Sequence, residues 1–218
     1  MKKYAIAALL AGTLMVPVAE AAQVVFSNPA HRDQSYGGGE FGVDIDGNNT
    51  VDFYTFCLEK NEGLAFNKPY DYTLGVSAIN GGLGGGNPDP ISQGTSYLYN
   101  RFLNQNLPGY SFANNAARAA SGRQLQNAIW ALENEQAVDN SNPFIQLVAG
   151  VFGSVAAAMS DAVTGGIGAL NPTDPSVATT SPLFRRQSVL INLPDNGMAV
   201  MLLGGSLMLL GAARRRMA

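Results

Sequence analysis

Alternating apolar and polar residues run from Gln23 to Tyr72 and predict β-strands. The clearest stretch, GEFGVDIDGNNTVDFYTFCLE, contains a turn-forming run at Asp46-Gly47-Asn48-Asn49 and is typical of a hairpin. Successive side chains of a strand point to opposite faces. One face of the second strand therefore carries Phe53, Thr55 and Cys57, and the other carries Tyr54, Phe56 and Leu58.

The pattern changes to a helical period after a Gly/Asn/Pro-rich loop at 79–90. Asp89 followed by Pro90 predicts the start of a helix over ISQGTSYLYNRFLNQ, with Asp89 as its N-cap. Ser121 is the next candidate N-cap, ahead of GRQLQNAIWALENE. In that segment apolar residues recur at i, i+3, i+4 and i+7, which predicts an amphipathic helix; they are Leu125, Ala128, Ile129 and Leu132.

Two further elements complete the chain. Asn142-Pro143 predicts the start of a third helix, PFIQLVAGVFGSVAAAMSDAV, which should end before Gly165-Gly166. A Pro/Ser/Thr-rich connection then leads to SVLINL (188–193), which predicts one closing strand. Strands first, helices next and a late strand predict an α+β fold: an antiparallel β-sandwich or barrel-like core with an inserted helical subdomain.

The first 22 residues have the pattern of a secretory signal peptide. Lys2 and Lys3 precede an apolar run, and Ala19-Glu20-Ala21 offers a small-x-small cleavage site. We therefore expect export and a mature chain that starts near residue 22 or 23, leaving residues 23–192 as one domain of ordinary size.

The C-terminal segment, 193–218, has three parts. A pentapeptide (Leu193, Pro194, Asp195, Asn196, Gly197) precedes sixteen uncharged, mostly apolar residues and the cluster Arg214, Arg215, Arg216. Those sixteen residues would make a helix of about 24 Å, marginal as a membrane span, and the arginines predict a cytoplasmic end.

This tail resembles the sorting signals of bacterial surface proteins, above all the VPDSG variety that an exosortase-type protease processes. It departs from that signal at Leu193 and Asn196, and it is also similar to the LPxTG signal of sortases. The resemblance implies an exported protein of the cell surface or extracellular matrix, held transiently or permanently by its C-terminal helix. A plain membrane anchor is the alternative interpretation.

Charge excludes one class of partner. The chain carries 13 basic and 16 acidic side chains, and setting aside the terminal segments leaves 8 and 15 between residues 23 and 197. An acidic domain of this kind is no candidate for nucleic acid. The sequence has no phosphate-binding loop and no His/Cys set with metal-ligand spacing, so we expect no cofactor.

Cys57 is the only cysteine, which excludes an internal disulfide. It can be an inert buried residue, form an intermolecular disulfide, or pair with the only histidine, His31, as a thiol–imidazole dyad.

A further interpretation comes from two motifs. Phe56-Cys57-Leu58 and Leu125-Gln126-Asn127-Ala128-Ile129-Trp130 resemble the aromatic-Cys-aliphatic and aliphatic-Gln-x-x-aliphatic-Trp motifs of bacterial internal thioester domains, found in surface adhesins. Both motifs match at every specified position, and the resemblance covers about residues 36–193. It implies a thioester between Cys57 and Gln126, in an environment formed by Phe56, Leu58, Leu125, Ile129 and Trp130.

The chemistry explains these residue types. A Cys57 sulfur held against the Gln126 carboxamide attacks its carbonyl and expels ammonia, and a thiolate accessible near neutral pH makes sulfur the suitable nucleophile. An amine, such as a lysine on a host or neighbouring protein or a polyamine, then attacks the thioester and leaves an amide crosslink. This is a single covalent capture rather than enzymatic turnover. The alternative is a non-covalent structural or matrix protein of the same fold without a reactive thioester.

A calcium loop is a weaker alternative at DIDGNNTVD, with Asp44, Asp46 and Asp52 as ligands. The glycine comes at position 4 instead of 6, and Thr55 occupies the position of the bidentate glutamate. A hairpin turn explains the same residues more simply.

Overall fold

The computed structural model describes residues 23–33, 37–79, 82–113, 116–161 and 166–193. Six antiparallel strands form its main sheet, in the order β3-β2-β1-β4-β7-β8. Their bounds are Gln23–Ser27 (β1), Phe41–Asp44 (β2), Phe53–Thr55 (β3), Pro69–Gly75 (β4), Ile167–Thr173 (β7) and Val189–Asn192 (β8). A second, two-stranded sheet pairs β5 (Ser77–Ala78) with β6 (Asp89–Pro90).

The main sheet curls until its two edge strands nearly meet. Just after β3, Cys57 forms an antiparallel bridge with Val189 of β8. Two backbone hydrogen bonds support the bridge, from Leu58 N–H to the Ser188 carbonyl (3.0 Å) and from Leu190 N–H to the Phe56 carbonyl (3.1 Å). Cys57 therefore lies at the seam that closes the barrel, which protects strand edges that would otherwise be open.

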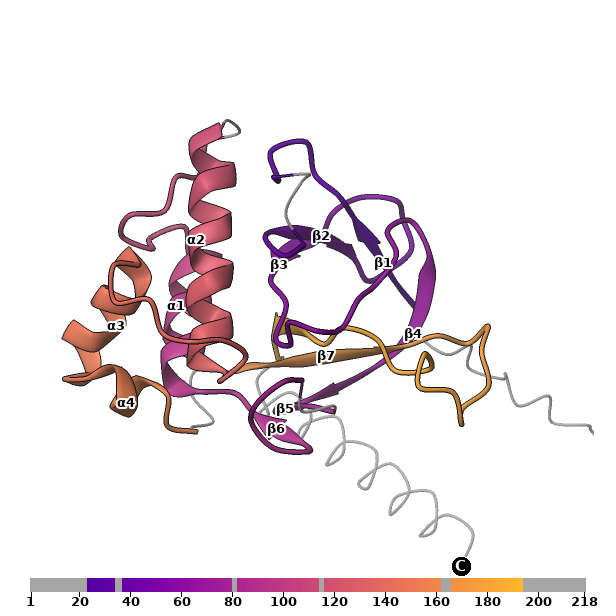
Figure 1. The fold of residues 1–218 in the computed structure, drawn as a ribbon. Helices are drawn as coiled ribbons and strands as arrows, with labels where there is room; N and C mark the ends of the chain where they lie inside the picture. The colour runs from indigo at the N-terminus through magenta and orange to yellow at the C-terminus, as the bar shows by residue number, and fades with distance from the viewer. Residues whose placement is uncertain (1–22, 34–36, 80–81, 114–115, 162–165, 194–218) are drawn as a thin grey trace, which may run out of the picture.

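Among the described residues, four helices are inserted between β6 and β7 and gather on one side of the barrel, with α2 next to β2 and β3 (Figure 1). They are α1 (Gln93–Leu103), α2 (Ala116–Leu132), α3 (Pro143–Phe152) and α4 (Val155–Ala158). The predicted α+β class, with a barrel-like antiparallel core and inserted helices, is confirmed.

Several predicted boundaries were wrong. The N-cap of α1 is Ser92, whose hydroxyl accepts from Thr95 N–H, whereas Asp89 and Pro90 form β6. Helix α2 begins five residues before Ser121, and the Ser121 hydroxyl is satisfied inside the helix by donating to the Ala117 carbonyl.

The end of the helical region also differs from the prediction. Asn142 caps α3 as expected, but α3 ends at Phe152 because Gly153 adopts a left-handed conformation (φ 81°). The long strand β7 was missed and runs antiparallel between β4 and β8, so two late strands complete the sheet instead of one.

The apolar side chains form two main cores. One fills the barrel and consists of Val24, Phe26, Val43, Tyr70, Leu170, Val189 and Ile191. The other lies between the helices and the outer face of the sheet, and it includes Phe56, Leu98, Leu125, Ile129 and Leu190. Because the second core fixes α2 against β3 and β8, it sets the position of Gln126 relative to Cys57.

The predicted signal peptide (1–22), Pro194 to Gly197 of the pentapeptide, the apolar segment and the arginine cluster lie outside the described residues. Leu193 lies at the end of the described chain and donates its N–H to the Gly166 carbonyl (2.6 Å). Among the described residues, no helix is long and apolar enough to cross a membrane.

Candidate functional site

Cys57 and Gln126, which are 69 residues apart, face one another and are both buried. The Gln126 carboxamide makes two hydrogen bonds to the backbone of Cys57. Its Oε1 accepts from Cys57 N–H at 2.9 Å, and its Nε2 donates to the Cys57 carbonyl at 2.9 Å. The two residues named by the motifs are thus brought into direct contact.

The geometry follows from the barrel seam. The flanking residues Phe56 and Leu58 use their backbone groups to bond β8, so the N–H and carbonyl of Cys57 point to the opposite side. That side faces α2, and the Gln126 side chain hydrogen-bonds the Cys57 backbone there. A buried backbone N–H and a buried carbonyl each need a hydrogen-bond partner. The Gln126 carboxamide supplies an acceptor for the first and a donor for the second.

A third contact comes from a glycine run that the sequence analysis did not single out. Gly39 N–H donates to Gln126 Oε1 at 3.2 Å, so two backbone donors converge on one carbonyl oxygen. Gly39 has φ +107°, which disfavours any other residue. At Gly38 an added Cβ would lie 2.6 Å from both Gln126 Cγ and Trp130 Cη2, so only glycine fits this close approach.

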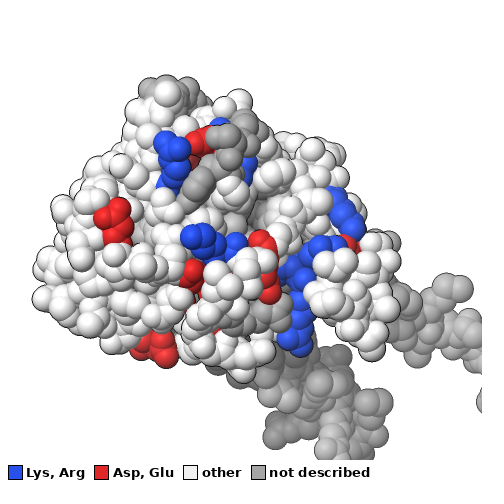
Figure 2. Space-filling model, in the orientation of Figure 1, with Lys and Arg blue, Asp and Glu red and all other residues white. Residues whose placement is uncertain are grey.

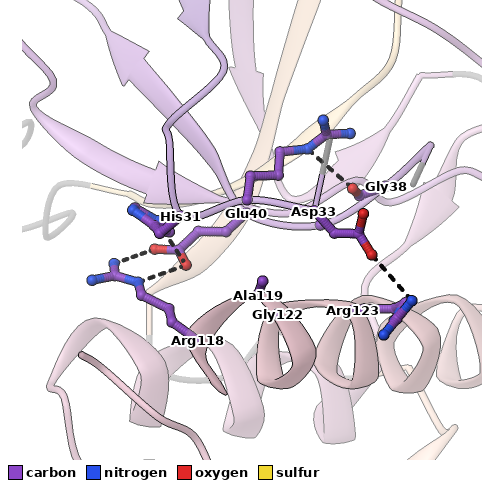
Figure 3. Close-up of a pocket in the computed structure, with 10 residues that line it drawn as sticks. His31, Asp33, Gly38, Glu40, Arg118, Ala119, Gly122 and Arg123 are labelled. Atoms are coloured by element: carbon purple, nitrogen blue, oxygen red, sulfur yellow. Dashed lines mark hydrogen bonds and ion pairs between the residues drawn. The ribbon is translucent and has the colours of Figure 1, made fainter. Parts of the chain in front are cut away.

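The segment that carries these glycines is fastened to α2 by charged side chains (Figure 3). Arg118 binds Glu40, and Arg123 binds Asp33 at 3.0 Å. Arg32 Nε donates to the Gly38 carbonyl at 3.2 Å. These contacts surround a cavity of about 10 Å³, which has room for one water molecule at most. They hold the Gly39 donor in place over Gln126.

Trp130 packs with Cys57 and Phe41 in a small apolar cluster and is only 5% exposed. The Lys60 ammonium lies 5.5 Å from the centre of the Trp130 ring. The other predicted environment residues, Phe56, Leu58, Leu125 and Ile129, belong to the core between the helices and the sheet. Trp130 is therefore the motif residue that packs against Cys57, and the other four fix the elements.

The thiol differs from the sequence-based expectation of a readily formed thiolate. Burial raises the pKa of Cys57 well above its ordinary value, and the nearby Glu59 carboxylate raises it further, while Arg32 acts in the opposite direction. The sulfur is therefore protonated near neutral pH, and its proton has to be removed for it to attack a carbonyl.

The alternative partners of the sequence analysis lie elsewhere. His31 contacts Glu40, with 3.2 Å between Nε2 and Oε2, and its ring lies 5.3 Å from that of Tyr54. Burial lowers the pKa of His31 and favours the neutral imidazole. No hydrogen bond or ring contact among the described residues joins His31 to Cys57.

The three aspartates of the hairpin do come together, with ligand oxygens of Asp44, Asp46 and Asp52 within 4.8 Å of one another. Their carboxylates also organise the turn. Asp44 accepts from the N–H groups of Gly47 and Asn49, and Asp52 accepts from Ile45 N–H. The hairpin interpretation accounts for these contacts.

The molecular surface adds little charge patterning. On the face shown in Figure 2, acidic and basic side chains are scattered over a mostly uncharged surface. Comparison with protein-family models, with curated proteins and with solved structures finds no match for this chain. The contact between Cys57 and Gln126 is therefore the feature of the molecule that points to a function.

Proposed function

We propose that Cys57 and Gln126 form an internal thioester that captures amines covalently. The observation that carries the proposal is the Gln126 carboxamide, which is held against Cys57 by two backbone hydrogen bonds and by a third from Gly39. A fixed nucleophile and electrophile turn a slow amide attack into an effectively intramolecular reaction.

The two donors on Gln126 Oε1 match the demands of this chemistry. When sulfur adds to the carbonyl carbon, negative charge develops on Oε1. Preorganised N–H groups about 2.7–3.1 Å from such an oxygen stabilise the transition state. Cys57 N–H lies at 2.9 Å, within this range, and Gly39 N–H lies at 3.2 Å, just beyond it. The same two donors would polarise the thioester carbonyl when an amine attacks it.

Burial supports storage of a reactive bond. Gln126 is fully buried, Cys57 is 3% exposed, and Trp130 packs beside them. Water is thereby kept from a bond that it would hydrolyse. A target amine would form an amide with the Gln126 carbonyl and release the thiol, once per molecule. Together with the surface-sorting signals in the sequence, this supports a protein that attaches a bacterial surface or matrix to an amine-bearing partner.

A second candidate is a structural protein without the thioester. The same reciprocal hydrogen bonds favour it, because a buried glutamine that satisfies a strand edge needs no further role. The raised pKa of the Cys57 thiol also agrees with an inert residue.

Labelling with biotin-cadaverine separates the two candidates. The purified protein should become biotinylated at Gln126, identified by peptide mapping, and Cys57→Ala should abolish the label. Asn171→Ala, which removes a different buried carboxamide, should keep it. An unlabelled wild-type protein, or a Cys57→Ala variant that labels equally well, would refute covalent capture.

A further inference from the structure

An open groove of about 350 Å³ lies where β3 runs beside the end of α1 and the start of α2. Its volume falls within the range of ligand-binding pockets, about 300–1,000 Å³. Its lining includes four aromatic and two charged side chains: Phe53, Tyr54, Phe102, Phe112, Asp52 and Arg118. We refer to it as the aromatic groove, and the chemistry at Cys57 and Gln126 makes no use of it.

The aromatic side chains give the groove an apolar wall. Phe102 is 4% exposed, and its ring centre lies 5.8 Å from that of Phe112. Phe53, Tyr54 and Phe112 are half-buried, so part of each side chain is open to a ligand. Such a wall suits the methylene stem of a lysine or arginine, which packs on apolar surface while its charged head stays in water.

Negative charge accompanies this wall. Asp52 lines the groove, and its carboxylate belongs to a group with Asp44 and Asp46 whose oxygens lie within 4.8 Å of one another. The positive charge of Arg118 is offset, because both oxygens of Glu40 bind its guanidinium (Figure 3). The groove thus combines apolar surface with an excess of acidic groups, which favours a basic side chain over a neutral or acidic one.

The groove also lies close to the thioester site along α2. Arg118 lines both the groove and the small cavity beside Gly38 and Gly39. These two glycines contact Gln126, which follows Arg118 by eight residues (118 to 126) on α2. Eight residues of helix measure about 12 Å, a distance that an extended peptide covers in about four residues.

We propose that the aromatic groove binds a basic side chain of the amine-bearing partner and thereby places a lysine of the same segment beside the thioester. This inference rests on the proposed function. The methylene stem lies along the aromatic wall, and the charged head faces the Asp52 carboxylate. The partner is a protein segment with a lysine about four positions from a second lysine or arginine. Binding in the groove raises the effective concentration of that lysine at the site.

Two acetylated peptides test the groove: Arg-Gly-Gly-Gly-Lys-amide and the same peptide with glutamine in place of arginine. The guanidinium stays protonated, so lysine is the one amine that each peptide offers for capture. Intact mass of the wild-type protein gives both capture rates. The arginine peptide should be captured about 5- to 10-fold faster, the combined scale of an exposed ion pair and an aromatic contact. Added salt should reduce this advantage.

Variants of the groove should remove the advantage of the arginine peptide. Asp52→Asn deletes the charge but keeps an acceptor for Ile45 N–H, and Val51→Lys adds a positive charge at a lining position that is 42% exposed. Each should capture the two peptides at about equal rates. Asp139→Asn is the matched control, because it removes the charge of an exposed aspartate in the turn before α3, and it should keep the full advantage. Methylamine capture should equal that of the wild type in all three variants.

Each outcome discriminates. Equal rates for the two peptides in the wild type, or an advantage that survives both Asp52→Asn and Val51→Lys, would overturn the groove and leave the thioester intact. A wild type that captures neither peptide nor methylamine would refute the thioester itself. The groove is then judged by an NMR titration of the Cys57→Ala protein. The arginine peptide should shift the resonances of Tyr54 and Phe112 more than the glutamine peptide does, and equal shifts would contradict the groove.

Discussion

Gln126 and Asn171 are buried carboxamides that each satisfy a backbone N–H and a backbone carbonyl, and of these two only Gln126 lies beside a thiol. Asn171 of β7 accepts from Ile79 N–H (3.1 Å) and donates to the Ser77 carbonyl (3.2 Å), while Gln126 does the same for a single residue, Cys57. Both side chains are almost fully buried. Each side chain therefore has the same hydrogen-bonding role toward the backbone.

The difference lies in what else each amide meets. Asn171 Oδ1 receives the Ser188 hydroxyl at 2.7 Å, so the neighbouring nucleophile donates its proton to the amide oxygen. Gln126 Oε1 instead receives a second backbone N–H, from Gly39, and the amide faces the residue that carries the sulfur. Converging donors and a nearby nucleophile are therefore present at both amides. The difference is that the Ser188 hydroxyl is itself one of the donors to Asn171 Oδ1, whereas both donors to Gln126 Oε1 are backbone N–H groups.

Removal of either reacting group, the Cys57 sulfur or the Gln126 carboxamide, should have the largest effect on amine capture. Cys57→Ala should abolish ammonia loss and amine labelling completely, yet remain folded because the hydrogen bonds to Gln126 come from its backbone. Gln126→Ala should abolish the chemistry and also destabilise the fold by about 1–3 kcal/mol for each unpaired backbone group. Urea unfolding of both variants measures the difference; equal destabilisation would argue against backbone-only contacts.

Displacement of Gly39 N–H, the second donor to Gln126 Oε1, should have the next largest effect. Gly39→Ala strains a positive-φ position and shifts the N–H that binds Gln126 Oε1, so thioester formation should slow by about 100-fold, the usual cost of losing such a donor. Gly37→Ala is the control, because an added Cβ there meets nothing within 4 Å. Time-resolved intact mass gives both rates, and equal rates would remove Gly39 from the mechanism.

Removal of the Asn171 carboxamide should lower stability and leave amine labelling unchanged. Asn171→Ala leaves Ile79 N–H and the Ser77 carbonyl without their amide partner and should cost about 1–3 kcal/mol of unfolding free energy. Its amine labelling should equal that of the wild type. Loss of labelling in a folded Asn171→Ala protein would show that the two amides are coupled.

The smallest expected effect concerns pH. Burial raises the pKa of Glu133 to about 7, above its ordinary unfolded value of about 4.3. The folded state then binds more protons than the unfolded state between these values, so the Glu133 contribution to stability is lost as pH rises from about 4.3 to about 7. Glu133→Gln should flatten the stability profile across this window without changing amine labelling. Urea midpoints from pH 4 to 8 provide the check, and an unaltered slope would contradict the assignment.

The sequence predicted the fold class and the hairpin well because alternation and turn residues are local signals. It missed β7, whose Asn171 and Pro172 fell in the predicted Pro/Ser/Thr-rich connection and are held in the sheet by pairing with β4. The Cys57 and Gln126 contact was predicted only through paired motifs, since no periodicity links residues so far apart. Gly38 and Gly39 were not singled out, because their role depends on the tertiary approach of α2.

The raised pKa of Cys57 and the position of Glu59 could not be predicted from the sequence either. Both depend on closure of the barrel at the Cys57–Val189 bridge, which buries the thiol and brings the Ser188 N–H to the acid.

The most direct test of the central claim is the intact mass of the purified protein before and after methylamine. An intact Cys57–Gln126 thioester predicts a mass short by one ammonia, which rises to that of the methylamine adduct on Gln126. A full unmodified mass with a free Cys57 thiol, and with Gln126 not converted to glutamate, would contradict it.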